Sequence, residues 1–142
     1  MQAVLDPPLS LWFFESRQEG ESEGSPDQKT VWKRRYLVCR FCKAKITSTA
    51  ARIEMKGSHE HTFFNPAGVV YRIGCFVRAP GCMQDRQASD EFTWFPGHRW
   101  RIASCRKCGC HLGWSFSGTG SGFFGLILNR ILPMEQDEPG PE

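Results

Sequence analysis

Two Cys-x-x-Cys pairs, far apart in the chain, restrict its possible folds more than any other feature. They are Cys39/Cys42 and Cys105/Cys108, and 62 residues separate them. Each pair can place two thiolates on one ion, and two pairs complete the tetrahedral four-sulfur shell of a structural zinc site. Because such a shell leaves no open coordination position, we expect one structural Zn²⁺ that holds distant parts of a small domain together, with the functional surface elsewhere.

The three remaining cysteines bear on the cellular compartment. Cys75, Cys82 and Cys110 are an odd remainder, so at least one is a free thiol, which favours a reducing environment. Cys75 and Cys82 can still form a disulfide in an oxidising one. The first apolar residues are interrupted by Asp6-Pro7-Pro8 and follow no basic residue, unlike a signal peptide. We therefore expect a cytoplasmic or nuclear location, or a secreted one if the N-terminus is incomplete.

The 142 residues suffice for one domain with extensions at both ends. Residues 1–30 are expected to be a mostly disordered extension, 31–132 a dense zinc domain, and 133–142 a disordered acidic tail. The net charge of +3 rises to +11 within residues 30–132, which permits contact with polyanions. A solvated basic surface is the simpler interpretation, so nucleic acid is not an expected partner. Nor is a membrane, because no apolar run approaches the roughly 18 residues of a span.

Within the dense segment the hydrophobic period is two, which indicates strands. Residues 69–78 alternate in this way, residues 100–104 lead into the second cysteine pair, and residues 112–116 lead out of it. The second pair is therefore expected to join two strands of a hairpin. Only the stretch 126–132 has a weak helical pattern. With nine Pro and fourteen Gly to make turns, the predicted class is all-β.

Tryptophans gather around this hairpin. Trp94 and Trp100 flank a Pro96-Gly97 turn, and Trp114 and Phe116 share one face of the strand after the second cysteine pair. The three indoles are therefore expected to be neighbours. Ordinary core packing is one interpretation. The other is an open aromatic cage, which avoids burying three indole N–H groups that each need a partner.

Several stretches, in this order, resemble the cereblon-type CULT domain, the thalidomide-binding domain, and together they cover about residues 36–132. The resemblance implies a β-tent of two antiparallel sheets pinned by a four-cysteine zinc. It also implies a stand-alone binding module that is not an enzyme. The matching stretches are Cys39-Arg-Phe-Cys42, His59-Glu-His-Thr-Phe-Phe-Asn-Pro-Ala-Gly68, Glu91-Phe-Thr-Trp-Phe-Pro-Gly-His-Arg-Trp100, Cys105-Arg-Lys-Cys108, His111-Leu-Gly-Trp114-Ser-Phe116 and Phe123-Phe-Gly-Leu126.

The family's pocket binds cyclic imides: the glutarimide of thalidomide-type drugs, uracil-like rings, and cyclic imides at peptide C-termini. The resemblance implies that Trp94, Trp100 and Trp114 form the walls, Phe116 the base, and Asn65 and Pro66 the rim, with backbone groups from Phe92 to Trp94 reading the imide edge. Where cereblon has a histidine, this chain has Phe92, so that residue's extra hydrogen bond is missing. Without the family's adaptor-docking regions, binding of a ligase adaptor by this chain alone is not expected.

Two other functions are weighed against imide binding. A methionine sulfoxide reductase has a related zinc fold but needs a reactive thiol of lowered pKa. Cys75 falls on the apolar side of a strand, and Cys82, after the Pro80-Gly81 turn, is expected to be more exposed but has no family signature around it. Cys110, two residues past a zinc ligand and beside His111, is interpreted as a packing residue or a minor contact. A methyl-lysine reader usually adds a carboxylate to its cage, for which Glu91 is the candidate. His59 and His61 form a possible but weaker metal pair.

Overall fold

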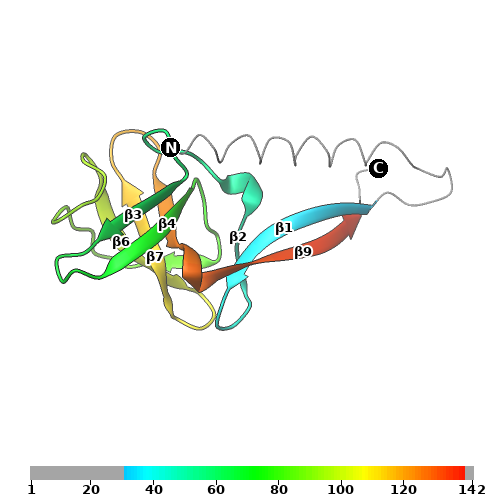
Figure 1. Cartoon of the computed structure of the whole chain (residues 1–142). Helices are drawn as coiled ribbons and strands as arrows, with labels where there is room; N and C mark the ends of the chain where they lie inside the picture. The colour runs from blue at the N-terminus through cyan, green and yellow to red at the C-terminus, as the bar shows by residue number, and fades with distance from the viewer. Residues whose placement is uncertain (1–30, 140–142) are drawn as a thin grey trace. The chain divides into compact units, whose positions relative to one another are not determined.

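Two antiparallel sheets make up residues 31–139, the part of the chain that the computed structural model describes (Figure 1). The smaller sheet has the strand order β2-β1-β9 and the larger one β3-β4-β8-β7-β6-β5. The predicted all-β class is thus confirmed. The strands are β1 (Val31–Cys39), β2 (Lys45–Ser48), β3 (Glu60–Phe64), β4 (Val70–Phe76), β5 (Cys82–Gln84), β6 (Arg99–Cys105), β7 (His111–Ser117), β8 (Phe123–Ile127) and β9 (Ile131–Pro139).

The weak helical pattern near residues 126–132 corresponds to a single 3-10 turn, η3 (Leu128–Arg130), between β8 and β9. A second such turn, η2 (Thr49–Ala51), follows β2. These two turns are the helical elements of residues 31–139, so almost all backbone hydrogen bonding in that range is between strands or within loops.

The hairpin around the second cysteine pair forms as expected. β6 and β7 pair so that Trp100 lies opposite Phe116 and Ile102 lies opposite Trp114. The register shifts between Ala103 and Ser104, just before the cysteine turn. Since alternate side chains of a strand share one face, Trp100 and Ile102 face the same side of the sheet, as do Trp114 and Phe116.

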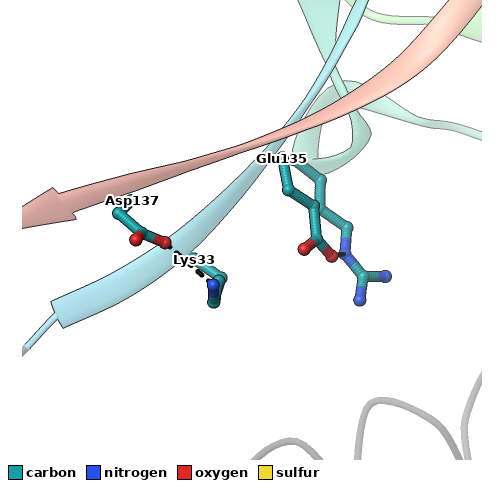
Figure 2. Close-up of polar contacts among 4 residues, drawn as sticks. Lys33, Glu135 and Asp137 are labelled. Atoms are coloured by element: carbon teal, nitrogen blue, oxygen red, sulfur yellow. Dashed lines mark hydrogen bonds and ion pairs between the residues drawn. The ribbon is translucent and has the colours of Figure 1, made fainter.

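The prediction of a disordered tail from residue 133 was wrong as far as Pro139, because these residues continue strand β9 beside β1. Acidic side chains of β9 meet basic ones of β1: Lys33 Nζ lies 2.9 Å from Asp137 Oδ1, and Arg35 Nε lies 3.0 Å from Glu135 Oε2 (Figure 2). The acidic run thus has a charged partner about a hundred residues earlier. The extension predicted for residues 1–30 lies outside the described residues.

Residues 34–136 form a compact unit with two buried clusters. One joins the cysteine turns to both sheets, and includes Leu37 and Ile46 from the smaller sheet and Leu112 and Leu126 from the larger. The other lies in the larger sheet and its loops and consists of Ile73, Cys75, Phe95, Phe116, Phe123 and Ile127. Each cluster supports one candidate site. The first contains two of the predicted zinc ligands, and the three indoles pack against the second.

Candidate metal centre and aromatic pocket

The structure brings the four predicted zinc ligands together. The Sγ atoms of Cys39, Cys42, Cys105 and Cys108 all lie within 4.8 Å of one another. Cys39 and Cys108 are 3.7 Å apart, and Cys42 and Cys105 are 3.6 Å apart. A tetrahedral ion bonded to sulfur at about 2.3 Å requires sulfurs about 3.8 Å apart. The cluster therefore has the size and the donor set of a four-thiolate zinc site.

Both cysteine turns have the same local construction. In the first, the Cys39 N–H donates to the Ala44 carbonyl and the Lys43 N–H donates back to the Cys39 carbonyl, each at 2.8 Å. In the second, Cys105 exchanges equivalent bonds with Cys110 and Gly109 at 2.9 Å. The residue after the second cysteine is left-handed in each turn, with φ of 66° at Lys43 and 81° at Gly109. This reversal lets both thiols of a pair face one point.

The two turns end strands of different sheets, since Cys39 closes β1 and Cys105 closes β6. A metal bound by all four thiols would therefore link the smaller sheet to the larger. Burial opposes ionisation of Cys39, but hydrogen bonds from the Cys42 and Phe41 backbone and from neighbouring thiols outweigh it. They lower the pKa of Cys39 to about 6, so a thiolate is available there near neutral pH.

Cys75 and Cys82 have the environment of structural thiols. Each is at most 3% exposed, and burial raises the pKa of each to about 12. The expectation that Cys82 is the more exposed was wrong, because β5 pairs it directly opposite Cys105 in the sheet. Such high pKa values leave almost no thiolate at neutral pH, which disfavours a cysteine-based reductase.

All seven residues predicted for the ligand site line one cavity of about 420 Å³. Trp100 reaches it from β6, and Trp114 and Phe116 from β7, whereas Trp94 comes from the loop before β6. The predicted gathering of the three indoles is therefore present in the fold. The full lining consists of Asn65, Pro66, Tyr71, Glu91, Phe92, Trp94, Trp100, Ile102, His111, Trp114 and Phe116.

Neighbouring rings fix the orientation of the walls. Trp94 and Trp114 meet edge to face, with centroids 4.8 Å apart and ring planes at 75°. Phe63 stacks on Trp94 at 4.8 Å, and Tyr71 meets Trp114 at 5.1 Å and 80°. Offset-stacked and edge-to-face pairs of this kind are favourable. Trp94 and Trp114 are therefore held by other aromatic rings, and both stay only partly buried.

Two of the indole N–H groups are already hydrogen-bonded. Trp94 Nε1 donates to the Phe64 carbonyl at 3.2 Å, and Trp100 Nε1 donates to the Glu91 carbonyl at 2.9 Å. The backbone at the end of β3 and at Glu91 thus satisfies two of the three clustered indoles. What these two side chains offer to the cavity is their apolar faces.

The rim has an ordered turn on one side and a left-handed residue on the other. Asn65 Oδ1 accepts hydrogen bonds from the Ala67 N–H at 3.0 Å and the Val69 N–H at 2.9 Å, which fixes the β3–β4 turn. Phe92 has a φ of 55° and is 72% exposed. A left-handed backbone is uncommon for a bulky residue, so the loop geometry holds Phe92 there in spite of its side chain.

Sequence reasoning missed three lining residues: Tyr71, Ile102 and His111. The two-residue period could have identified Ile102, which shares a face with Trp100. Tyr71 lies on β4, which is separated from β7 by β8, and no local pattern reveals that neighbourhood. His111 packs against Trp114 with centroids 4.8 Å apart, and its Nε2 lies 2.9 Å from the Gly113 carbonyl oxygen.

His59 and His61 are held by backbone carbonyls. His59 Nδ1 lies 3.1 Å from the Ile53 oxygen, and His61 Nε2 lies 2.9 Å from the Met55 oxygen. Neither belongs to a metal-capable cluster within residues 31–139, where the four cysteines form the group found. In that same range no helix has the length and apolar character needed to cross a membrane.

No protein-family model matches the chain. It is similar to protein cereblon of Danio rerio, with 35% identity over 115 residues, 75% of this chain and 26% of that protein. Against protein cereblon of Gallus gallus the identity is 36% over 76 residues, 50% of this chain and 17% of that protein. Protein cereblon of Drosophila melanogaster is 29% identical over 113 residues, which are 74% of this chain and 19% of that protein. The chain thus spans about a quarter or less of these relatives.

Proposed function

The chain carries a cereblon-type domain, and from that premise we propose that its aromatic cavity binds a small planar cyclic imide or a peptide that ends in one. The four-cysteine cluster fits a zinc-binding domain of this type. The observation that carries the imide proposal is the convergence of Trp94, Trp100 and Trp114 on one cavity.

The cavity has the size and chemistry of a small-molecule site. Ligand pockets commonly occupy about 300–1,000 Å³ and are lined mainly by apolar and aromatic groups, and this one occupies about 420 Å³. With the N–H groups of Trp94 and Trp100 bonded to backbone, the walls suit a flat, neutral ring better than a strongly hydrated ion.

A cyclic imide also has a polar edge, with two carbonyls on either side of one N–H. The Phe92–Trp94 segment offers groups that can read this edge. Within residues 31–139, the backbone N–H and C=O groups of Phe92 and Trp94 make no hydrogen bond to protein. Pairing the imide N–H in a desolvated site should make N-methylation cost about 1–3 kcal/mol, or about ten- to a hundredfold in affinity.

Partial burial of the tryptophans favours a cage over simple core packing. Trp94, Trp100 and Trp114 pack against the buried cluster that contains Phe95 and Phe116. None of the three is itself fully buried. Each indole therefore contacts the core on one side and lines the cavity on another side.

The presence of Glu91 in the cavity lining favours a different ligand, a methylated lysine. Its backbone carbonyl accepts the Trp100 N–H, whereas its side chain makes no ion pair within residues 31–139. A carboxylate beside aromatic faces can stabilise a quaternary ammonium. The two ligands are distinguishable, since only the cation depends on the charge of Glu91.

The test is a titration of zinc-loaded protein with glutarimide, uracil, N-methylglutarimide and tetramethylammonium, followed by tryptophan fluorescence. We expect saturable changes with the two free imides and a markedly weaker response to the N-methylated ring. Trp100→Ala should abolish the response. Trp32→Ala is the matched control, because Trp32 is a partly exposed indole of β1 that does not line the cavity.

A folded, zinc-loaded protein that responds to none of the imides would overturn the proposal and leave the tryptophans as packing residues. Stronger binding of tetramethylammonium, lost in Glu91→Gln, would establish the methyl-lysine alternative. Turnover of a methyl sulfoxide with dithiothreitol would instead indicate a reductase.

A further inference from the structure

A fifth thiol lies beside the metal cluster. Cys110 Sγ is 3.5 Å from Cys39 Sγ, closer than the 3.7 Å that separates Cys39 from its predicted co-ligand Cys108. Cys110 also interacts with the thiol of Cys108. It is outside the group of four whose sulfurs are all within 4.8 Å of one another. Cys110 therefore lies on the Cys39–Cys108 side of the cluster.

The backbone holds Cys110 in this position. Its carbonyl accepts the Cys105 N–H at 2.9 Å, which closes the turn on the residue just before β7. Gly109, with a φ of 81°, stands between Cys108 and Cys110 and reverses the chain there. Both thiols consequently approach Cys39 from one loop.

We propose that Cys110 is a reserve zinc ligand, so that Cys39, Cys42 and Cys105 hold the metal together with either Cys108 or Cys110. In the exchange the bond between zinc and the Cys108 sulfur breaks as the bond to the Cys110 sulfur forms. The Cys110 proton passes to the departing thiolate, or to solvent if Cys108 has been modified. Nothing is oxidised or reduced, and the inference does not depend on the imide proposal.

The reserve thiol stands next to the ligand that most needs one. Cys108 is exposed, whereas Cys39 and Cys105 are buried and Cys42 is intermediate. Reagents that attack thiols should therefore reach Cys108 first. The first turn has no such reserve, because Lys43 and Ala44 follow Cys42. This difference between the turns provides an internal control.

The test compares the Co²⁺ and Zn²⁺ complexes of Cys108→Ser, Cys42→Ser and the double variant C108S/C110S. Cys108→Ser should keep the absorption of a four-thiolate Co²⁺ site and lose less than about tenfold in Zn²⁺ affinity. Cys42→Ser and the double variant should show three-thiolate spectra and lose about a hundredfold or more, because four ligands share the binding free energy of a structural zinc. Equal losses in Cys108→Ser and Cys42→Ser would overturn the proposal.

A second measurement keeps Cys108 in place, in case its replacement prevents folding. Zinc-loaded wild-type and Cys110→Ser proteins are treated with limiting iodoacetamide, the modified cysteine is located by mass spectrometry, and released zinc is measured with a chromogenic chelator. Alkylation at Cys108 should release little zinc from the wild type and one equivalent from Cys110→Ser. Equal release from both proteins would show that Cys110 does not replace Cys108.

Discussion

The indole N–H of Trp100 donates a hydrogen bond to the backbone carbonyl of Glu91, with 2.9 Å between Nε1 and the oxygen. The backbone of Trp100 also exchanges hydrogen bonds with Ser89 at 2.8 and 2.9 Å. One residue of β6 therefore anchors the loop that carries Phe92 and Trp94 and supplies a wall of the cavity.

Trp100→Phe separates these two contributions. Phenylalanine keeps an aromatic face but cannot donate to Glu91, so the loop loses one hydrogen bond worth about 1 kcal/mol. We expect roughly fivefold weaker imide binding by fluorescence or calorimetry, with a melting temperature within a few degrees of the wild type. Unchanged affinity would mean that the backbone bonds to Ser89 alone position the loop.

Removal of the metal should unfold the domain. The thiols of Cys39 and Cys105 come from different sheets, and structural zinc contributes on the order of 10 kcal/mol to small domains. We expect Cys105→Ser, or wild type treated with a strong chelator, to lose its cooperative thermal transition in circular dichroism. Added Zn²⁺ should restore the transition in the wild type only. A chelated protein that melts normally would contradict a structural role for the cysteine cluster.

Gly113 and Gly125 should differ in their tolerance of alanine. A methyl group at Gly113 would collide with the backbone carbonyl of Gly125 on β8. One at Gly125 would lie 2.8 Å from Ile73 Cδ1 and 3.0 Å from Phe116 Cε2, which are side-chain atoms that can shift. Overpacking costs about 1–3 kcal/mol, so we expect Gly113→Ala to be the more destabilising in urea denaturation. The reverse order would show that β7 and β8 separate more readily than Phe116 moves.

Stability should fall on mild acidification, in part through His59. Burial lowers the pKa of His59 below the ordinary histidine value of about 6.5. The unfolded chain therefore binds a proton at higher pH than the folded domain does, and stability declines as the pH falls below about 6.5 towards the folded pKa. Loss of zinc also destabilises the domain in acid. The quantity to compare is therefore the pH dependence of the urea stability in the wild type and in His59→Gln. The wild type should show the steeper decline in urea stability between pH 7 and 5.5, and identical slopes would exclude His59.

The β6–β7 hairpin was predictable because its signals are local. Hydrophobic residues alternate both before Cys105 and after Cys108, so the sequence alone predicts that Trp100 and Trp114 lie on neighbouring strands. The register of β6 and β7 confirms this prediction. The convergence of the two cysteine pairs was predictable for a different reason, namely that four thiols at this spacing have a common chemical use.

Other features depend on contacts distant in sequence. The composition of the acidic run that includes Glu135 and Asp137 indicates a disordered tail, but Arg35 and Lys33 on β1 are its partners. The Pro80-Gly81 turn before Cys82 indicates an exposed thiol, but pairing with β6 buries it. In each case a neighbouring strand, invisible in the local pattern, decides the environment of the side chain.

Among the strands of residues 31–139, β9 stands at the border of its sheet, and this position has a consequence for self-association. A border strand presents free N–H and C=O groups on which another chain can add a strand. Pro133 and Pro139 of β9 have no N–H to donate to an added strand, and proline is tolerated mainly in border strands. Glu135 and Asp137 add charge along the same strand. The residues that make this segment resemble an unfolded tail are thus suited to protecting a folded sheet from aggregation.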